Sequence, residues 1–225
     1  MPVPWRLGAE LSDTEKRAIT KSVQSFQLGE SSEGNHLRRA AKQWSEANSD
    51  LAYCESVDLF IKEEQRHARE LGRFLELNSI DLIEKNWTDS LFRSIRRLAG
   101  LELSIMVLLT AEIVAQVYYV ALAASTKSGI LAAICNQIVK DEEQHVRFQC
   151  ERLAIMARGR GLTHVMFRYG FQRAFLFCAL PVVWSGNRQA YRAGGYSYSR
   201  FFSETWLAFN RAVPLMHPEN YSWPS

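Results

Sequence analysis

Among the five histidines in this 225-residue chain, His67 and His145 each follow a glutamate by three positions. The pairs are Glu64 with His67 and Glu142 with His145. Residues three apart are neighbours on a helix, so each pair could present one carboxylate oxygen and one imidazole nitrogen to a metal ion. A single pair is weak evidence, because so short a motif arises by chance and a solvated surface pair is its ordinary explanation. The positions of further acids therefore decide whether the pairs bind metal.

Two other glutamates stand at matching positions relative to these pairs. Glu30 lies 34 residues before Glu64, and Glu112 lies 30 residues before Glu142. The midpoint of each interval falls in a polar segment that is typical of a turn. Residues equidistant from the turn of an antiparallel helix pair lie at the same height, so each hairpin sets a lone glutamate opposite a glutamate–histidine pair. Two such hairpins in a four-helix bundle would bring four carboxylates and two imidazoles to its centre.

Four carboxylates cannot be buried together without compensation, because each desolvated charge is costly and the like charges repel. Two divalent cations would supply that compensation. Mixed oxygen and nitrogen ligation suits iron or manganese, and the absence of thiolate ligands argues against a structural zinc site. The cysteines offer no local metal-binding spacing; they are Cys54, Cys135, Cys150 and Cys178.

The elements that must position these residues are predicted to be helices. None of the six prolines lies between Pro4 and Pro181, and a helix interior excludes proline at a cost of about 3 kcal/mol. Apolar residues also recur at spacings of three and four. The predicted helices run from Ser12 to Trp44, from the turn at 45–50 to Asn78, near 91–124 with a weak point at Gly100, from 130 to 158 after a turn at 125–129, and near 163–184 and 199–211.

Composition and charge exclude several classes of protein. With 47% hydrophobic residues the chain can bury a sizeable core, so a disordered or fibrous protein is excluded. A net charge of +3 is too small to indicate nucleic-acid binding. No signal-peptide pattern is visible and the cysteines show no disulfide framework, so we expect a cytoplasmic protein.

Two apolar segments raise the question of a membrane or an interface. Leu101–Ala124 is long enough to span a bilayer, but polar residues such as Glu102 and Gln116 interrupt it, so we expect a buried core helix and no membrane. The segment Phe171–Trp184 is too short to span. We expect it to form a homodimer contact or to lie on a membrane surface, with a homodimer preferred.

The constellation of glutamates and histidines resembles the ferritin-like di-iron carboxylate superfamily, and locally it is most similar to rubrerythrin. The segment 29–31 (Gly-Glu-Ser), with Asn35 nearby, is similar to the first ligand helix of that family. The segment 64–68 (Glu-Gln-Arg-His-Ala), followed by Leu71, Phe74 and Leu75, is similar to the second. The resemblance covers residues 15–158. It implies an all-α fold, with a ferritin-like four-helix bundle over 12–160 and an aromatic-rich C-terminal extension of additional helices over 161–225 packed on it.

The resemblance also implies a set of metal ligands and a cofactor of two iron ions, with two manganese ions or one of each as alternatives. The implied ligands are Glu30, Glu64, His67, Glu112, Glu142 and His145.

Further acids are implied to support the ligands. Asp141 matches an outer acid that holds a ligand histidine in oxygen-activating members, and Glu63 stands at the equivalent place in the other hairpin. Glu33 is expected to face inward, three residues beyond Glu30. Rubrerythrins carry an extra glutamate at this offset in the other hairpin, where this chain has Ala115. Glu33 is therefore either a mobile seventh ligand or proton relay, or a structural residue.

These features lead us to expect an oxidoreductase that activates O2 or peroxide at a non-haem dimetal site. The apolar third helix and the aromatic extension suggest a small hydrophobic organic substrate. No rubredoxin-like cysteines are present, so electrons would come from a separate donor or from the substrate itself. One alternative is a ferroxidase or peroxide-scavenging protein of the rubrerythrin kind, and another is a non-enzymatic bundle that binds metal. Tyr118 and Tyr119 are expected to pack in the core, or one of them to lie near the metals.

Overall fold

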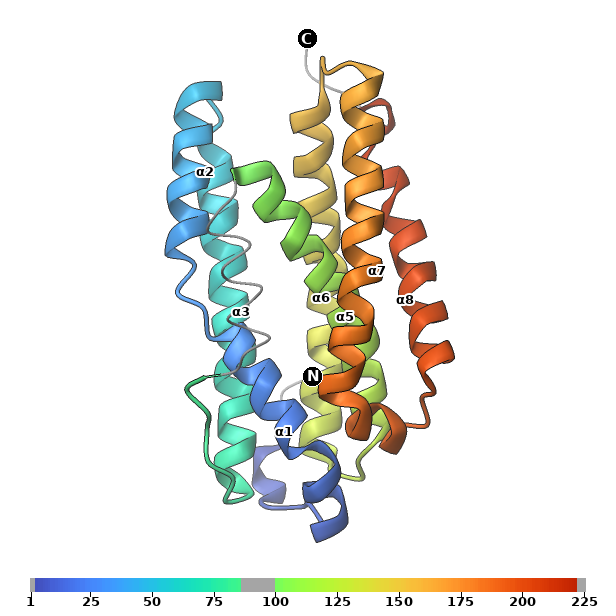
Figure 1. Cartoon of the computed structure of the whole chain (residues 1–225). Coiled ribbons are helices and arrows are strands. Elements are labelled where there is room, and N and C mark those ends of the chain that lie inside the picture. Colours follow the sequence, from blue (N-terminus) through green and yellow to red (C-terminus); the bar gives the residue numbers. More distant parts are fainter. Residues whose placement is uncertain (1–2, 86–99, 222–225) are drawn as a thin grey trace.

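Helices account for nearly all the regular structure of the computed structural model, which describes residues 3–85 and 100–221 (Figure 1). No strand occurs within these two ranges, so the predicted all-α class is confirmed. The helices are α1 (Asp13–Glu30), α2 (Asn35–Asn48), α3 (Leu51–Leu77), α5 (Leu101–Ala124), α6 (Gly129–Ala157), α7 (Leu162–Ala193) and α8 (Tyr198–Ala212). Short 3-10 turns lie at Trp5–Leu7, Pro214–Met216 and Pro218–Asn220.

Polar side chains fix where several of these helices begin. Ser12 and Glu15 form a capping box at the start of α1, in which each side chain accepts the backbone N–H of the other residue. Asp50 and Ser128 accept backbone N–H groups in the first turns of α3 and α6. These caps set the starting points of the two helices that carry the glutamate–histidine pairs.

The prediction of a single helix from Ser12 to Trp44 is wrong, because the helix is interrupted between α1 and α2. Residues 31–34 are not helical, and Gly34 has a φ of +67°, in the left-handed region that favours glycine. A Cβ atom on Gly34 would overlap the Ile61 side chain of α3. The break thus lets the chain pass close to α3, directly after Glu30. Helix α2 also continues to Asn48, so the predicted turn at 45–50 is reduced to residues 49–50.

The other predicted helices agree more closely with the structure. The second and fourth end within one residue of their predicted positions, at Leu77 and Ala157. Of the third predicted helix, residues 101–124 form α5, and its first part lies outside the described residues. Helix α7 extends to Ala193, well past the predicted end at 184, with Pro181 inside it.

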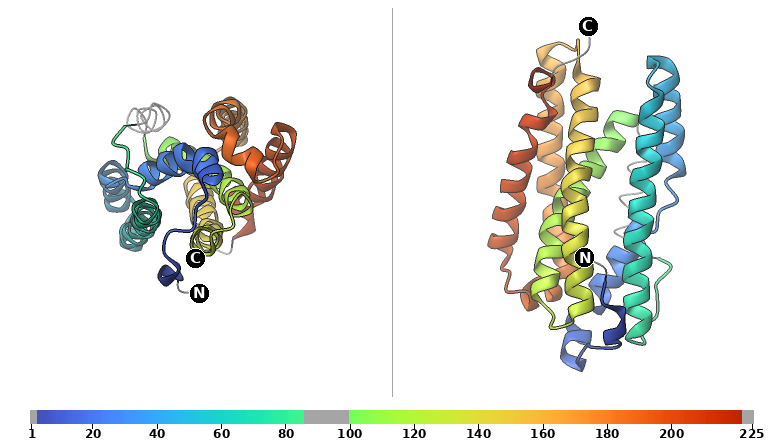
Figure 2. Two further views of the ribbon diagram at one scale, coloured as in Figure 1. Left: turned by 90° about the horizontal axis from the view of Figure 1, so that it is seen from below. Right: turned by 180° about the vertical axis from the view of Figure 1, so that it is seen from behind.

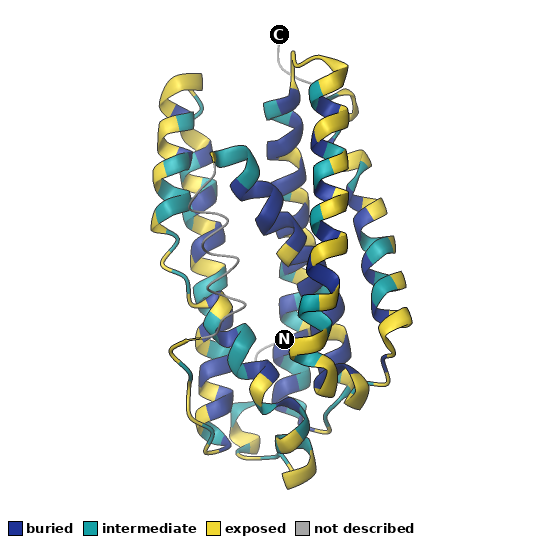
Figure 3. Ribbon diagram, viewed as in Figure 1, coloured by how far each residue is buried: buried dark blue, intermediate teal, exposed yellow. Residues whose placement is uncertain are grey.

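Helices α1 and α2 each pack against α3, α5 and α6 form an antiparallel hairpin, and α3 contacts α6. Seen from behind, α6 lies between α3 and α8 (Figure 2). Buried residues line the facing sides of the helices, and α5 is buried over most of its length (Figure 3). By length and composition Leu101–Ala124 could cross a membrane, but 83% of its most apolar window is buried inside the protein. It has the character of the predicted core helix.

Helix α7 packs against α5 and α1, and α8 packs against α5. Trp184, Tyr191 and Phe201 join α7 to α8 through ring contacts with centroids 4.6–5.8 Å apart. The end of α7 is close to α5, because a Cβ on Gly194 would overlap the backbone carbonyl of Ala121. The C-terminal helices therefore form a wall along the side of α5.

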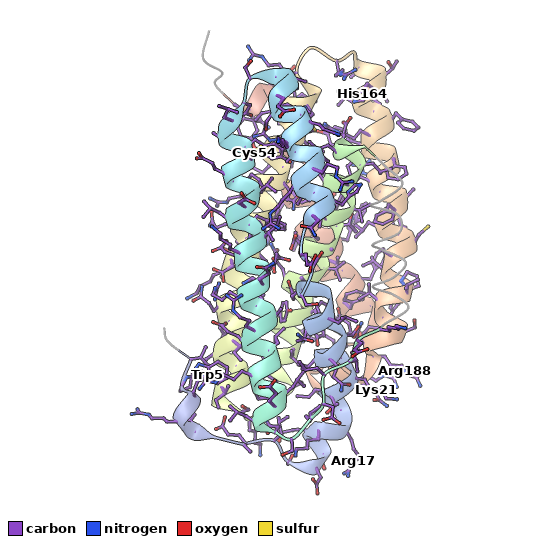
Figure 4. All side chains as sticks on the ribbon, turned by 90° about the vertical axis from the view of Figure 1, so that its left-hand side faces the viewer. Trp5, Arg17, Lys21, Cys54, His164 and Arg188 are labelled. Carbon is purple, nitrogen blue, oxygen red and sulfur yellow. The ribbon has the colours of Figure 1, made fainter. Side chains whose placement is uncertain are left out.

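Side chains also close the two ends of the molecule (Figure 4). At the start of α7, His164 lies 3.2 Å from a carboxylate oxygen of Glu102. At the opposite end, the guanidinium of Arg73 on α3 stacks 4.2 Å above the ring of Trp5. The residues with metal-ligand spacing lie between these two ends.

Candidate metal centre

Four helices each carry part of a buried cluster of glutamates and histidines. Glu30 is the last residue of α1, and Glu112 lies in the middle of α5. Helices α3 and α6 each present a glutamate and a histidine one turn apart, on the side that faces the other helices. The structure brings together all six residues predicted as ligands: Glu30, Glu64, His67, Glu112, Glu142 and His145.

The cluster consists of two groups of four residues that share two carboxylates. One group contains Glu30 and His67, and the other contains Glu112 and His145. Glu64 and Glu142 belong to both. Within each group, one ligand atom from every residue lies within 4.8 Å of the others. Such an arrangement could hold two metal ions side by side, with the shared carboxylates reaching both.

The two imidazoles point the same nitrogen into the cluster. Nδ1 of His145 lies 3.2 Å from an oxygen of Glu64 and 3.3 Å from an oxygen of Glu142. Nδ1 of His67 lies 3.7–3.9 Å from oxygens of Glu30, Glu64 and Glu142. These longer separations leave space for an ion between the nitrogen and the carboxylates.

Each imidazole is held from behind by an acid from the other hairpin. Nε2 of His67 lies 3.1 Å from Oδ2 of Asp141, and Nε2 of His145 lies 3.1 Å from Oε2 of Glu63. A carboxylate at Nε2 fixes the proton there, so Nδ1 keeps the lone pair that a metal ion requires. Asp141 and Glu63 immediately precede the shared glutamates in sequence. The two hairpins are therefore equivalent, in that each supplies an acid to the histidine of the other.

Asp141 is itself held by two further side chains. Nε2 of Gln137 donates a 2.9 Å hydrogen bond to Oδ1, and the guanidinium of Arg66 donates to Oδ2. Partial burial would raise the pKa of Asp141, but hydrogen bonds from His67, Arg66 and Gln137 lower it to about 2. Asp141 therefore stays an anion facing His67.

Burial and mutual repulsion make the charged form of the clustered carboxylates unfavourable. Burial raises the pKa of Glu30, Glu112 and Glu142 well above the ordinary range, and the neighbouring carboxylates contribute to the shifts of Glu30 and Glu112. Burial alone would lower the pKa of His145, but contacts with Glu64 and Glu112 raise it to about 9. The cluster therefore favours positive charge at its centre.

Three polar atoms at this centre make no hydrogen bond in the described structure: Oε1 of Glu64, Nδ1 of His67 and Oε1 of Glu142. Oε1 of Glu64 lies 3.2 Å from Nδ1 of His145, but this contact does not have the geometry of a hydrogen bond. Unpartnered buried polar atoms are rare in folded proteins because each costs about 1–3 kcal/mol. All three belong to the group that contains Glu30. Two divalent cations would satisfy these atoms and the excess of carboxylates together, so the residues fit a metal centre.

Glu33 does not face inward, contrary to prediction. It is exposed in the segment between α1 and α2, where its Oε2 accepts a 2.7 Å hydrogen bond from Asn35. The prediction assumed that the helix continues past Glu30. Because the helix is interrupted at residues 31–34, Glu33 does not lie on the helical face that carries Glu30. Glu33 belongs to neither group of ligand atoms and lines a separate, polar cavity.

Other residues around the cluster carried weaker signals in the sequence. The hydroxyl of Tyr119 donates a 2.7 Å hydrogen bond to Oε1 of Glu30, so Tyr119 is the tyrosine that lies beside the cluster. Gln137 precedes Asp141 by four residues and so shares its face of α6, which could have indicated the contact. Arg66 lies inside the motif 64–67, yet its partner on α6 is visible only in three dimensions.

An apolar cavity of about 170 Å³ opens onto the cluster between α1, α5 and α7. Three of the clustered carboxylates, Glu30, Glu64 and Glu112, line its inner end. The other described residues around it are Ser25, Phe26, Gly29, Val107, Leu108, Thr110, Ala111, Val114, Ala115, Ala179, Val183 and Asn187. The cluster is therefore accessible to something larger than a metal ion.

The polar cavity beside Glu33 shares only Leu108 with the apolar cavity among the described lining residues.

No protein-family model, curated protein sequence or solved structure matches this chain.

Proposed function

We propose that this protein is a dimetal-carboxylate oxidoreductase of the ferritin-like type, which activates O2 or peroxide and oxidises a small hydrophobic organic substrate. The observation that carries the proposal is the pair of buried ligand groups sharing Glu64 and Glu142, at the inner end of an apolar cavity. Two metal ions bound there would undergo changes of oxidation state that activate the oxidant.

The chemistry of the donor atoms supports iron or manganese as the resident metals. Glu30 and His67 would hold one ion, Glu112 and His145 the other, and the shared carboxylates would contact both. Carboxylate and imidazole together suit these metals, and no cysteine joins either group. Two iron ions are the first choice, with manganese or a mixed pair as the alternative.

The surrounding residues have definable roles in such a site. Asp141 and Glu63 would hold the imidazole protons at Nε2 and keep Nδ1 available. The hydroxyl of Tyr119 would orient Glu30 and could pass a proton to it. Phe26 and Val183, in the cavity wall, would exclude water from a bound substrate. Electrons would come from a separate donor or from the substrate.

The cavity favours an organic substrate over the alternative of a ferroxidase. The acidic residues among its described lining are all members of the cluster, so this described part of the wall offers no carboxylate path for iron(II) ions. An apolar wall is what a hydrophobic substrate requires. A purely structural metal site would also gain nothing from a cavity that reaches its ligands.

The proposal is tested by loading the protein with Fe2+ without oxygen and then measuring metal content, anomalous scattering and O2 consumption. Two ions per chain at the six residues are expected, with O2 uptake that continues only when a donor and an organic substrate are present. Glu142→Ala should lose at least one ion, whereas the exposed neighbour Glu143→Ala should retain both. Failure to find metal near His67 and His145 would overturn the proposal. Sustained iron(II) oxidation without organic substrate would establish the ferroxidase instead.

A further inference from the structure

The size and charge of the apolar cavity restrict what can occupy it, provided that the proposed function is correct. We propose that the cavity binds a neutral, largely apolar molecule of about six to nine non-hydrogen atoms. We further propose that Ala179 and Val183 of α7 limit the size of this molecule.

The volume of the cavity limits the size of its occupant. The cavity measures about 170 Å³, and an apolar cavity of about 150 Å³ in another protein accommodates one benzene molecule. A single aromatic ring with one or two substituent atoms, or an aliphatic chain of similar size, therefore fits. A long-chain lipid would have to extend far outside this space.

The charges around the cavity limit the charge of its occupant. No lysine, arginine or histidine occurs among the described residues that line the cavity. With two divalent ions balancing the cluster, which includes the carboxylates of Glu30, Glu64 and Glu112, the described wall supplies no further cation. An anionic substrate would therefore lose its hydration in the apolar part of the cavity without a charged partner. A cationic substrate would pair with the same carboxylates and compete with the metal ions. A neutral molecule avoids both costs.

The polar groups of the wall are largely engaged in hydrogen bonds within the protein. Asn187 accepts a 2.8 Å hydrogen bond from Ser22 and donates one of 2.8 Å to the carbonyl of Val183. The hydroxyl of Thr110 donates to the carbonyl of Met106 and accepts a 3.1 Å hydrogen bond from Gln172. A substrate rich in hydroxyl or amide groups would leave many of them unpaired in this wall.

Small side chains on α5 and α7 leave the space that forms the cavity. Ala179 and Val183 lie one turn apart on α7, and Ala111 and Ala115 lie one turn apart on α5. All four line the cavity, and three of them carry only a methyl group. Ala179 is buried, so a larger side chain there would extend into the cavity. Helix α7 thus contributes directly to substrate selection.

Binding of fluorobenzene to the Co2+-loaded protein, followed by 19F NMR, tests this inference. We expect fluorobenzene to bind one molecule per chain and to show paramagnetic broadening from the nearby ions. Its anionic counterpart 4-fluorobenzoate should bind at least tenfold more weakly. Ala179→Phe should abolish fluorobenzene binding with both ions retained, whereas Ala174→Phe, at an exposed position of the same helix, should change neither.

Val183→Phe provides a second way to fill the cavity if Ala179→Phe does not fold. Equal binding of 4-fluorobenzoate, or undiminished fluorobenzene binding in the folded variants, would overturn the inference. Two bound ions without fluorobenzene binding in the unchanged protein would overturn the inference and leave the proposed function standing. If the protein binds fluorobenzene but takes up no metal ions when Co2+ is supplied, the proposed function is overturned instead.

Discussion

Replacing Asp141 by asparagine should weaken metal binding mainly at one of the two ion positions. Oδ2 of Asp141 lies 3.1 Å from Nε2 of His67 and, as a carboxylate, favours a proton on that nitrogen, although the guanidinium of Arg66 also lies 3.3 Å from it. His67 belongs to the group that contains Glu30. An asparagine can present its NH2 group to Nε2, which would favour the tautomer with its proton at Nδ1. Nδ1 would then have no lone pair for the metal.

The expected loss of metal affinity follows from a comparison of the contacts Asp141–His67 and Glu63–His145, which have the same length but differ in their exposure to water. The side chain of Asp141 is 14% exposed and that of Glu63 is 47% exposed. Loss of a carboxylate behind a ligand histidine typically lowers metal affinity about 10- to 100-fold, or about 1.4–2.8 kcal/mol. We expect a loss in this range for Asp141→Asn, and a smaller loss, below about tenfold, for Glu63→Gln, because water screens the more exposed contact.

Competition titration with Co2+ and a chromophoric chelator, without oxygen, measures both dissociation constants. Asp141→Asn should raise one constant strongly and leave the other within about threefold. Asp141→Glu, which keeps a carboxylate, should restore much of the affinity, and thermal unfolding of the metal-free variants controls for folding. Unchanged affinity in Asp141→Asn, or equal losses in Asp141→Asn and Glu63→Gln, would refute this account of how the histidines are held.

Three further predictions concern pH and packing. Metal affinity should rise between pH 5 and 9, and metal loading should release protons. The reason is that the cluster carboxylates have raised pKa values, and that neighbouring carboxylates raise the pKa of His145 to about 9 against the opposite effect of burial. Calorimetry in buffers of different ionisation enthalpy measures the proton release, and a metal affinity that does not depend on pH would contradict the prediction. Glu15→Gln should lower the free energy of unfolding by about 1 kcal/mol at pH 7, a value discounted for solvent screening. Hydrogen bonds, chiefly from the Ser12 side chain, lower the pKa of Glu15 to about 2, so this stabilisation is complete above the unfolded pKa of about 4.5 and should disappear in urea melts as the pH falls to 2. Gly194→Ala should lower the free energy of unfolding by about 1–3 kcal/mol, because the added Cβ would clash with α5. Gly195→Ala, at a φ of +79° with open space around it, should cost about 1–2 kcal/mol from the backbone alone. If Gly194→Ala unfolds with the same equilibrium stability and the same rates as the unchanged protein, and α7 packs as before, the clash is contradicted.

Much of the fold could be predicted from the sequence because helices are encoded locally. The long interval without proline, the apolar spacing and the cap at Ser12 predicted the class and most helix boundaries. The break at residues 31–34 was missed. Its cause is non-local, since Gly34 takes a left-handed conformation where the chain passes against Ile61 of α3.

The candidate site divides in the same way. The spacing of Glu64–His67 and Glu142–His145, and the distances of Glu30 and Glu112 from the turns, are properties of the sequence, because an antiparallel helix pair converts sequence distance into height. They were sufficient to predict the six clustered residues.

Only the tertiary structure decided which carboxylates are shared, which acid lies behind which histidine, and which tyrosine contacts Glu30. The exposure of Glu33 and the apolar cavity against α7 were likewise decided there. These features depend on the rotation and separation of helices distant in the chain, and many side chains far apart in sequence set that packing jointly. Sequence periodicity determines which face of a helix is buried, but the neighbour that this face meets is a property of the assembled bundle.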